Sequence, residues 1–123
     1  MAEQKKKILV VDDDPMVIKL LESILNHEGY EAVVAKDGLE AMMQVKNHHP
    51  QLIVLDIMMP ELNGYDVCNT LKFDSPYKDT PIILLTSRGQ EIDPRIGQMM
   101  GIHYLQKPLN RDLFVTKIKE LLK

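Results

Sequence analysis

Residues 52–56 read LIVLD, a run of four apolar residues that ends in an aspartate. A second apolar run, residues 8–11, reads ILVV and leads into Asp12, Asp13 and Asp14. Strands of a parallel sheet are covered on both faces, so they read as short continuous apolar runs rather than as alternating ones. The two runs therefore predict two buried parallel strands, each with carboxylates at its C-terminal end.

Three further segments complete the strand pattern. Residues 82–85 read IILL and precede Thr86, and the weaker run 102–106 reads IHYLQ and precedes Lys107. A short strand is also predicted at residues 32–35, but no obvious ligand group follows it. In an open α/β sheet, ligands bind outside the carboxyl ends of the strands. Four of the predicted strand ends therefore offer acid, acid, hydroxyl and amine groups to one small region.

Helical patterns separate the strands. Asp14 is a predicted N-cap before Pro15, and Gly29 ends the helix that follows. The helix predicted after Asp93 contains Gly97 and should be short and weak. Five βα units with right-handed crossovers predict a doubly wound parallel five-stranded sheet of flavodoxin-like order 2-1-3-4-5.

In this fold Asp12, Asp13 and Asp56 are expected to be neighbours. Carboxylates placed close together repel one another, and a divalent cation relieves that repulsion. Mg²⁺ suits such a site because it takes oxygen ligands and keeps several waters. A carboxylate can also act as the nucleophile in phosphoryl transfer, while Lys107 and Thr86 could stabilise the phosphoryl oxygens. The pattern therefore predicts a site for magnesium and a phosphoryl group.

Composition narrows the class of protein. The chain has 123 residues, a net charge of −3 and a single cysteine, Cys68. The small net charge does not favour nucleic-acid binding, and no segment approaches the roughly 20 apolar residues that span a membrane. A lone cysteine cannot form an internal disulfide, which fits a reducing compartment. We expect a cytoplasmic protein that contacts neither membrane nor nucleic acid and is a monomer or weak dimer.

The motifs also resemble a known family along almost the whole chain. The segments that carry the resemblance are ILVVDDDP at 8–15, LDIMMP at 55–60 followed by Asn63-Gly64, LTS at 85–87 and YLQKP at 104–108. Together they are similar to a bacterial response-regulator receiver domain, in particular to the stand-alone chemotaxis regulators. The chain ends with its last predicted helix, so we expect one receiver domain, residues 1–123, without an output domain.

The resemblance implies a role for each residue of the site. Asp56 would accept a phosphoryl group from the phosphohistidine of a sensor histidine kinase or a histidine phosphotransfer protein. Asp13, Asp56 and the Met58 backbone carbonyl would ligate Mg²⁺, and Asp12 would act mainly through a bound water. Thr86 and Lys107 would hold the phosphoryl oxygens.

The resemblance further implies a switch. Thr86 and Tyr104 would move together and remodel a surface that binds a downstream protein target. Such a domain is a regulatory phosphoacceptor rather than an enzyme with a separate substrate.

Some positions depart from the family pattern or modify it. The segment from Gly101 to Lys107 is about one residue shorter than expected. Met58 and Arg88 each lie two residues beyond a site residue and should border the phosphoryl group. Our hypothesis is that apolar Met58 disfavours an attacking water and prolongs the phosphorylated state, so that Met58→Asn would accelerate loss of phosphate.

Two other functions compete with this interpretation. A small aspartyl-phosphate phosphatase of the haloacid-dehalogenase type would use Asp12 and Asp14, although Met16 does not fit its motif. A flavin-binding module is disfavoured because the first loop offers carboxylates where a flavin phosphate needs hydroxyls and glycines. The cognate kinase, the target and the pathway are left open by the sequence.

Overall fold

The structure is a computed structural model that describes residues 5–57, 64–72, 76–86 and 101–123. Side chains are described throughout these ranges except at residues 64–66 and 69. The predicted helix after Asp93, and the residues Met58 and Arg88, lie outside the described part of the chain.

Five parallel strands form one sheet, and their order confirms the predicted flavodoxin-like topology. In space the order is β2-β1-β3-β4-β5, so the first and third strands lie side by side. The strands are β1 (Lys7–Val11), β2 (Glu31–Ala35), β3 (Leu52–Asp56), β4 (Ile82–Thr86) and β5 (Ile102–Gln106).

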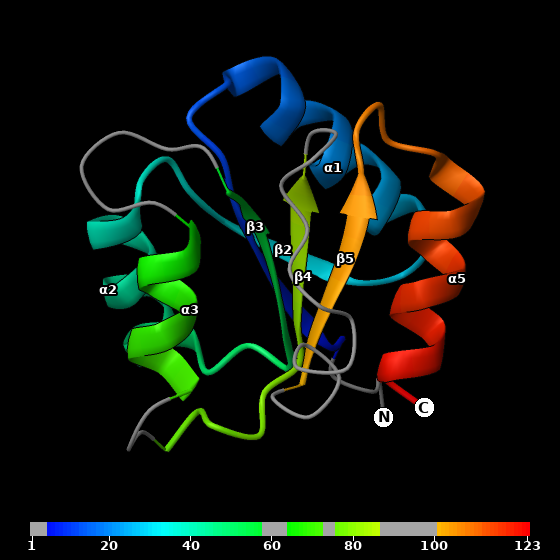
Figure 1. Ribbon diagram of the computed structural model, residues 1–123. Helices are drawn as coiled ribbons and strands as arrows, with labels where there is room; N and C mark the ends of the chain where they lie inside the picture. The colour runs from blue at the N-terminus through cyan, green and yellow to red at the C-terminus, as the bar shows by residue number, and fades with distance from the viewer. Residues whose placement is uncertain (1–4, 58–63, 73–75, 87–100) are drawn as a thin grey trace.

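Helices cover both faces of the sheet (Figure 1). On one side lie α2 and α3, and on the other lie α1 and α5. The bounds are α1 (Pro15–His27), α2 (Gly38–His48), α3 (Gly64–Lys72) and α5 (Arg111–Leu121).

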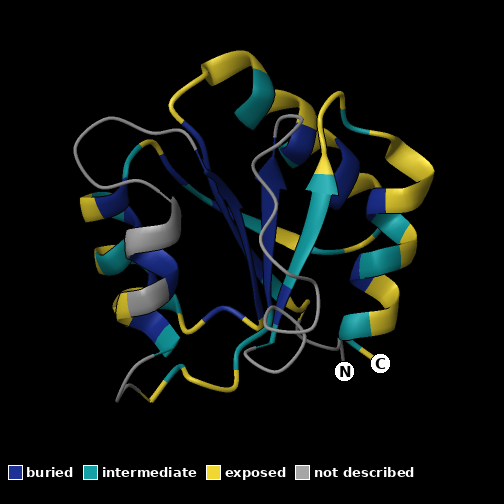
Figure 2. Ribbon diagram, viewed as in Figure 1, coloured by how far each residue is buried: buried dark blue, intermediate teal, exposed yellow. Residues whose placement is uncertain are grey.

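The alternation of side chains along each strand divides the core into two clusters. Leu9 and Ile53 pack with the α2 and α3 side, whereas Ile8 and Leu52 pack with the α1 and α5 side. The strands β3 and β4 are buried at every position, as the dark blue central strands in Figure 2 show. Burial on both faces is the physical reason why these strands read as unbroken apolar runs.

Side-chain caps fix where the helices begin. Asp14 accepts a hydrogen bond from the Met16 backbone N–H, and Pro15 occupies the first turn, as predicted. Asp37 Oδ1 accepts from the Glu40 backbone N–H at 2.8 Å at the start of α2. Each cap satisfies an N–H group that the helix itself leaves unpaired. Both helices begin within four residues of the carboxyl end of the preceding strand.

Candidate functional site

The strand register brings the predicted acidic residues together. Val11 pairs with Leu55 across β1 and β3, so Asp12 and Asp56 leave their strands at the same level. The Asp56 position in turn pairs with Leu85 on β4, one residue before Thr86. The carboxyl ends of three adjacent strands therefore meet at one edge of the sheet.

Three carboxylates form a compact cluster at this edge. Asp12, Asp13 and Asp56 each offer an oxygen, and these oxygens all lie within 4.8 Å of one another. Asp12 and Asp56 are buried, whereas Asp13 is exposed. The cluster thus combines two buried carboxylates with one that is exposed.

Asp12 shows the electrostatic cost of this arrangement. Burial raises the pKa of its carboxyl group to about 6, and the negative charges of Asp56 and Asp13 also raise this pKa. The hydrogen bond from the Asp14 N–H and the positive charge of Lys107 lower it. Its Oδ1 accepts a hydrogen bond from the Asp14 backbone N–H at 2.9 Å. Among the described residues, its buried Oδ2 has no hydrogen-bond partner. An unsatisfied buried oxygen in a carboxylate cluster fits a place for a divalent cation with oxygen ligands.

Lys107 is the cation that the described part of the chain places at this cluster. Its Nζ donates to Asp56 Oδ1 at 2.9 Å, and the Asp56 side chain is only 7% exposed. Just after β5, the Lys107 backbone N–H donates to the Thr86 carbonyl oxygen at 2.7 Å, which ties this loop to the end of β4. The amine predicted from the sequence is therefore placed directly on the predicted nucleophile.

The remaining predicted residues lie around this centre. Thr86 is fully buried at the end of β4, where its backbone pairs with Gln106. Tyr104 is half-buried on β5, pairs with Leu84 and packs against the core cluster on the α2 and α3 side. The Met58 carbonyl, predicted as a magnesium ligand, falls outside the described residues.

Two features of the region were missed from the sequence. Asp14 was predicted as a cap and, in the phosphatase alternative, as a partner of Asp12, but its backbone N–H also donates a hydrogen bond to the Asp12 carboxylate. The Asp-x-Asp spacing after a strand is the signal that could have indicated it. The second is a cavity of about 260 Å³ between α1 and α5, which contains none of the three clustered carboxylates. A cavity between two helices depends on packing that no local pattern specifies.

Comparison with known proteins assigns the chain and its fold to a family. The model of the response regulator receiver domain matches residues 8–119. This chain belongs to the response regulator receiver family. Among solved structures, the receiver domain resembles chemotaxis protein CheY4 of Vibrio cholerae, with a TM-score of 0.82 and 29% identity over 96% of this chain and 99% of that one.

The chain covers most of one curated relative and only about half of several others. Protein PilG of Pseudomonas aeruginosa is 35% identical over 92% of this receiver chain and 84% of its own length. The probable transcriptional regulator ycf27 of Cyanophora paradoxa is 44% identical over 97% of this chain but only 49% of its own. The chain thus spans about half the length of several curated relatives that it matches. None of the described helices is both long and apolar enough to cross a membrane.

Proposed function

We propose that this receiver domain is a phosphoacceptor switch whose acceptor is Asp56. The observation that supports this most strongly is the buried Asp56 carboxylate, held by Lys107 at 2.9 Å within the Asp12 and Asp13 cluster. A structural ion pair would not need two further carboxylates beside it, because they raise its electrostatic cost.

The proposed reaction is a phosphoryl transfer from a phosphohistidine. One Asp56 carboxylate oxygen attacks phosphorus, the bond between phosphorus and the donor imidazole nitrogen breaks, and the imidazole leaves with its electron pair. Negative charge is spread over the phosphoryl oxygens during this step. Lys107 is positioned to neutralise that charge, and Thr86, at the end of the next strand, is proposed to donate its hydroxyl to the same oxygens.

Asp12, Asp13 and Asp56 are the residues that would hold Mg²⁺, with the Met58 carbonyl as a proposed further ligand. The unsatisfied buried Oδ2 of Asp12 and the all-oxygen donor set fit this ion. When bound, the ion supplies positive charge that permits an anionic phosphoryl group to approach three carboxylates.

The partners follow from the chemistry of the transfer. The donor is proposed to be a sensor histidine kinase or a histidine phosphotransfer protein, and the output is proposed to be a protein target bound through a surface that Thr86 and Tyr104 remodel. Cytoplasmic location, the absence of membrane or nucleic-acid contacts by residues 1–123, and the absence of a separate enzymatic activity belong to the same proposal.

The hydrogen bonding of Asp14 argues against the phosphatase alternative. That enzyme type would use Asp12 and Asp14 together, but the Asp14 side chain caps α1 by accepting from the Met16 N–H. The Asp56 carboxylate, which the phosphatase motif does not contain, instead lies beside Asp12.

The experiment is incubation with acetyl phosphate and MgCl₂, followed by intact mass measurement. The wild-type chain should gain one phosphate-sized mass, and Asp56→Asn should gain none. Asp112→Asn removes an exposed carboxylate at the start of α5 and should behave as wild type. A mass gain in Asp56→Asn equal to that of wild type would refute the assignment of the acceptor.

A further inference from the structure

Asp12 and Asp14 form two successive turns of the same kind after β1. The Asp12 Oδ1 atom accepts a hydrogen bond from the Asp14 backbone N–H at 2.9 Å, and the Asp14 Oδ1 atom accepts one from the Met16 backbone N–H at 2.9 Å. In each turn an aspartate side chain holds the N–H group two residues further along the chain. The Asp14 side chain therefore restrains the segment whose N–H group is bound to Asp12.

The backbone on both sides of Asp14 is restrained as well. Before it, the Asp12 backbone N–H donates to the Ala35 carbonyl oxygen at the end of β2 at 3.2 Å. After it, Pro15 disfavours helical backbone at the preceding residue, and Asp14 is extended with φ of −92° and ψ of 111°. The Ile18 N–H donates to the Asp14 carbonyl oxygen at 3.1 Å. Asp14 thus connects the buried Asp12 carboxylate to the first turn of α1.

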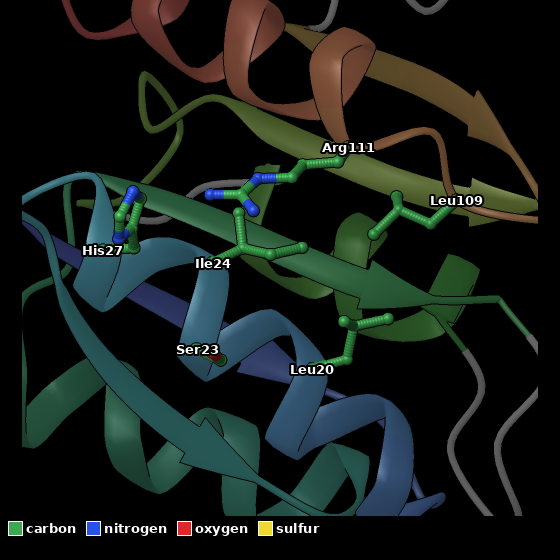
Figure 3. Close-up of a pocket in the computed structure, with 6 residues that line it drawn as sticks. All are labelled: Leu20, Ser23, Ile24, His27, Leu109 and Arg111. Atoms are coloured by element: carbon green, nitrogen blue, oxygen red, sulfur yellow. The ribbon is translucent and has the colours of Figure 1, made fainter.

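Packing holds the later turns of α1 more firmly than its first turn. Leu21 and Leu25 are fully buried in the core. Ile24 and His27 line the cavity between α1 and α5 (Figure 3). Met16, in the first turn, is 78% exposed. The first turn therefore depends on the Asp14 cap for its position more than the later turns do.

This restraint determines which oxygen of Asp12 is available to a cation. The Asp12 residue is only 2% exposed. Its Oδ1 is bound by the Asp14 N–H, and its buried Oδ2 has no hydrogen-bond partner in the part of the chain that the structure describes. The Oδ2 atom therefore remains for a cation that is held together with Asp13 and Asp56.

We propose that Asp14 is a positioning residue for magnesium. Its side chain holds the turn whose N–H orients the Asp12 carboxylate, and this raises the affinity of the acidic cluster for the ion. The inference rests on the magnesium site of the proposed function. Groups that orient a metal ligand change metal affinity although they do not touch the ion. The role requires an acceptor oxygen rather than a negative charge, because the contact is a hydrogen bond from the Met16 N–H.

Two substitutions at position 14 separate the hydrogen bond from the charge. Asp14→Asn keeps an acceptor oxygen suited to a helix cap, so its Kd for Mg²⁺ should stay within about twofold of wild type. Asp14→Gly removes the acceptor, yet glycine is well tolerated at this position of a helix, so the variant should fold. Direct loss of an orienting group typically costs about 10- to 100-fold in metal affinity. Asp14→Gly keeps the backbone N–H and loses only its restraint, so the Kd should rise about three- to tenfold.

The measurement is an NMR titration of the isotope-labelled full chain with MgCl₂ at constant ionic strength. The amide signals of residues 12–14 report binding, and the Kd comes from their saturation. Asp37→Gly is the matched control, because it removes the same kind of cap at α2, where Asp37 Oδ1 accepts from the Glu40 N–H. It should leave the Kd unchanged. An equal rise in Asp37→Gly and Asp14→Gly would assign the effect to the loss of any cap and overturn the proposal.

The two variants at position 14 decide between positioning and charge. A raised Kd in Asp14→Gly together with wild-type affinity in Asp14→Asn supports the proposal. Equal weakening in both variants would assign the effect to charge, and an unchanged Kd in Asp14→Gly would remove the effect. Either result overturns the inference and leaves the magnesium site intact. Wild-type signals that do not saturate with MgCl₂ would instead contradict the magnesium site itself, and the inference with it.

Discussion

At the scale of single residues, the most important feature is the excess of negative charge among the described residues of the acidic cluster. Among the described residues, three carboxylates share one edge of the sheet with the Lys107 amine, which contacts Asp56. Burial of Asp12 makes the imbalance costly, and its raised pKa reflects that cost. The described residues of the site therefore carry more negative than positive charge, which fits the proposed binding of a divalent cation.

Replacing Lys107 should slow phosphorylation without abolishing it. Lys107→Gln removes the cation that neutralises charge on the phosphoryl oxygens, and loss of one such electrostatic group typically costs on the order of 10² in rate. We expect the rate of phosphorylation by acetyl phosphate to fall by about 10- to 100-fold at saturating MgCl₂. Lys119→Gln, an equal loss of charge on α5, is the control, and an equal slowing in both variants would contradict the role of Lys107.

Magnesium should stabilise the folded chain through the acidic cluster. A ligand that binds only the folded state at about 100 times its Kd adds roughly 2.7 kcal/mol to the free energy of unfolding. We expect MgCl₂ to raise Tm in the wild type and EDTA to reverse the change. Asp13→Asn should reduce this rise strongly, whereas Asp112→Asn should retain it. A magnesium-dependent rise that survives in Asp13→Asn would place the ion elsewhere.

At the scale of elements, much of the architecture follows from short local patterns. The strands β1, β3 and β4 were predictable because burial on both faces leaves continuous apolar runs. The start of α1 was predictable because Asp14 caps it. The Asn110 cap of α5 was not predicted, although Asn110 Oδ1 accepts from the Leu113 N–H at 3.0 Å.

Gly29 is one of the described positions where the backbone conformation itself constrains the residue type. It follows α1 with φ of +90°, and a Cβ added there would meet nothing within 4 Å. A side chain at position 29 would therefore destabilise the fold through the strained backbone conformation, because it would not clash with neighbouring atoms. Gly29→Ala should lower the free energy of unfolding by roughly 1–2 kcal/mol.

Asparagine tolerates left-handed backbone better than alanine does, so Gly29→Asn should lose less stability. Urea unfolding of the three proteins measures the order. Equal stability of wild type and Gly29→Ala would show that this turn carries no such constraint.

At the scale of the whole molecule, the order of the strands in the sheet determines which residues from distant parts of the chain come together. Residues far apart in the chain, such as Asp12, Asp56 and Lys107, come together because parallel strands all end at one edge. This convergence was predictable from topology rules and the polar residues after each run. The α1–α5 cavity was not, because it depends on how Arg111 and Leu109 pack against residues of a helix at the other end of the chain.

His103 should contribute to the pH dependence of global stability. Burial lowers its pKa below the ordinary value of 6.5, Lys117 and Lys72 lower it further, and Glu120 opposes them. The unfolded chain therefore binds a proton at this histidine more readily than the folded chain does. The resulting contribution is fully present above about pH 7 and is lost as pH falls through 6.5 toward the folded-state pKa.

His103→Gln should flatten this dependence. The variant should lose less stability than the wild type between pH 8 and pH 5.5 in urea unfolding. An equally steep fall in His103→Gln would show that another group causes the acid sensitivity.

The most direct test locates the phosphoryl group on the chain. The phosphorylated protein is reduced with borohydride, which converts an aspartyl phosphate to homoserine, and is then digested and sequenced by mass spectrometry. The account predicts homoserine at position 56 and unmodified aspartate at positions 12 and 13. Homoserine at position 12 or 13, or at none of the aspartates of a protein that had gained phosphate, would contradict it.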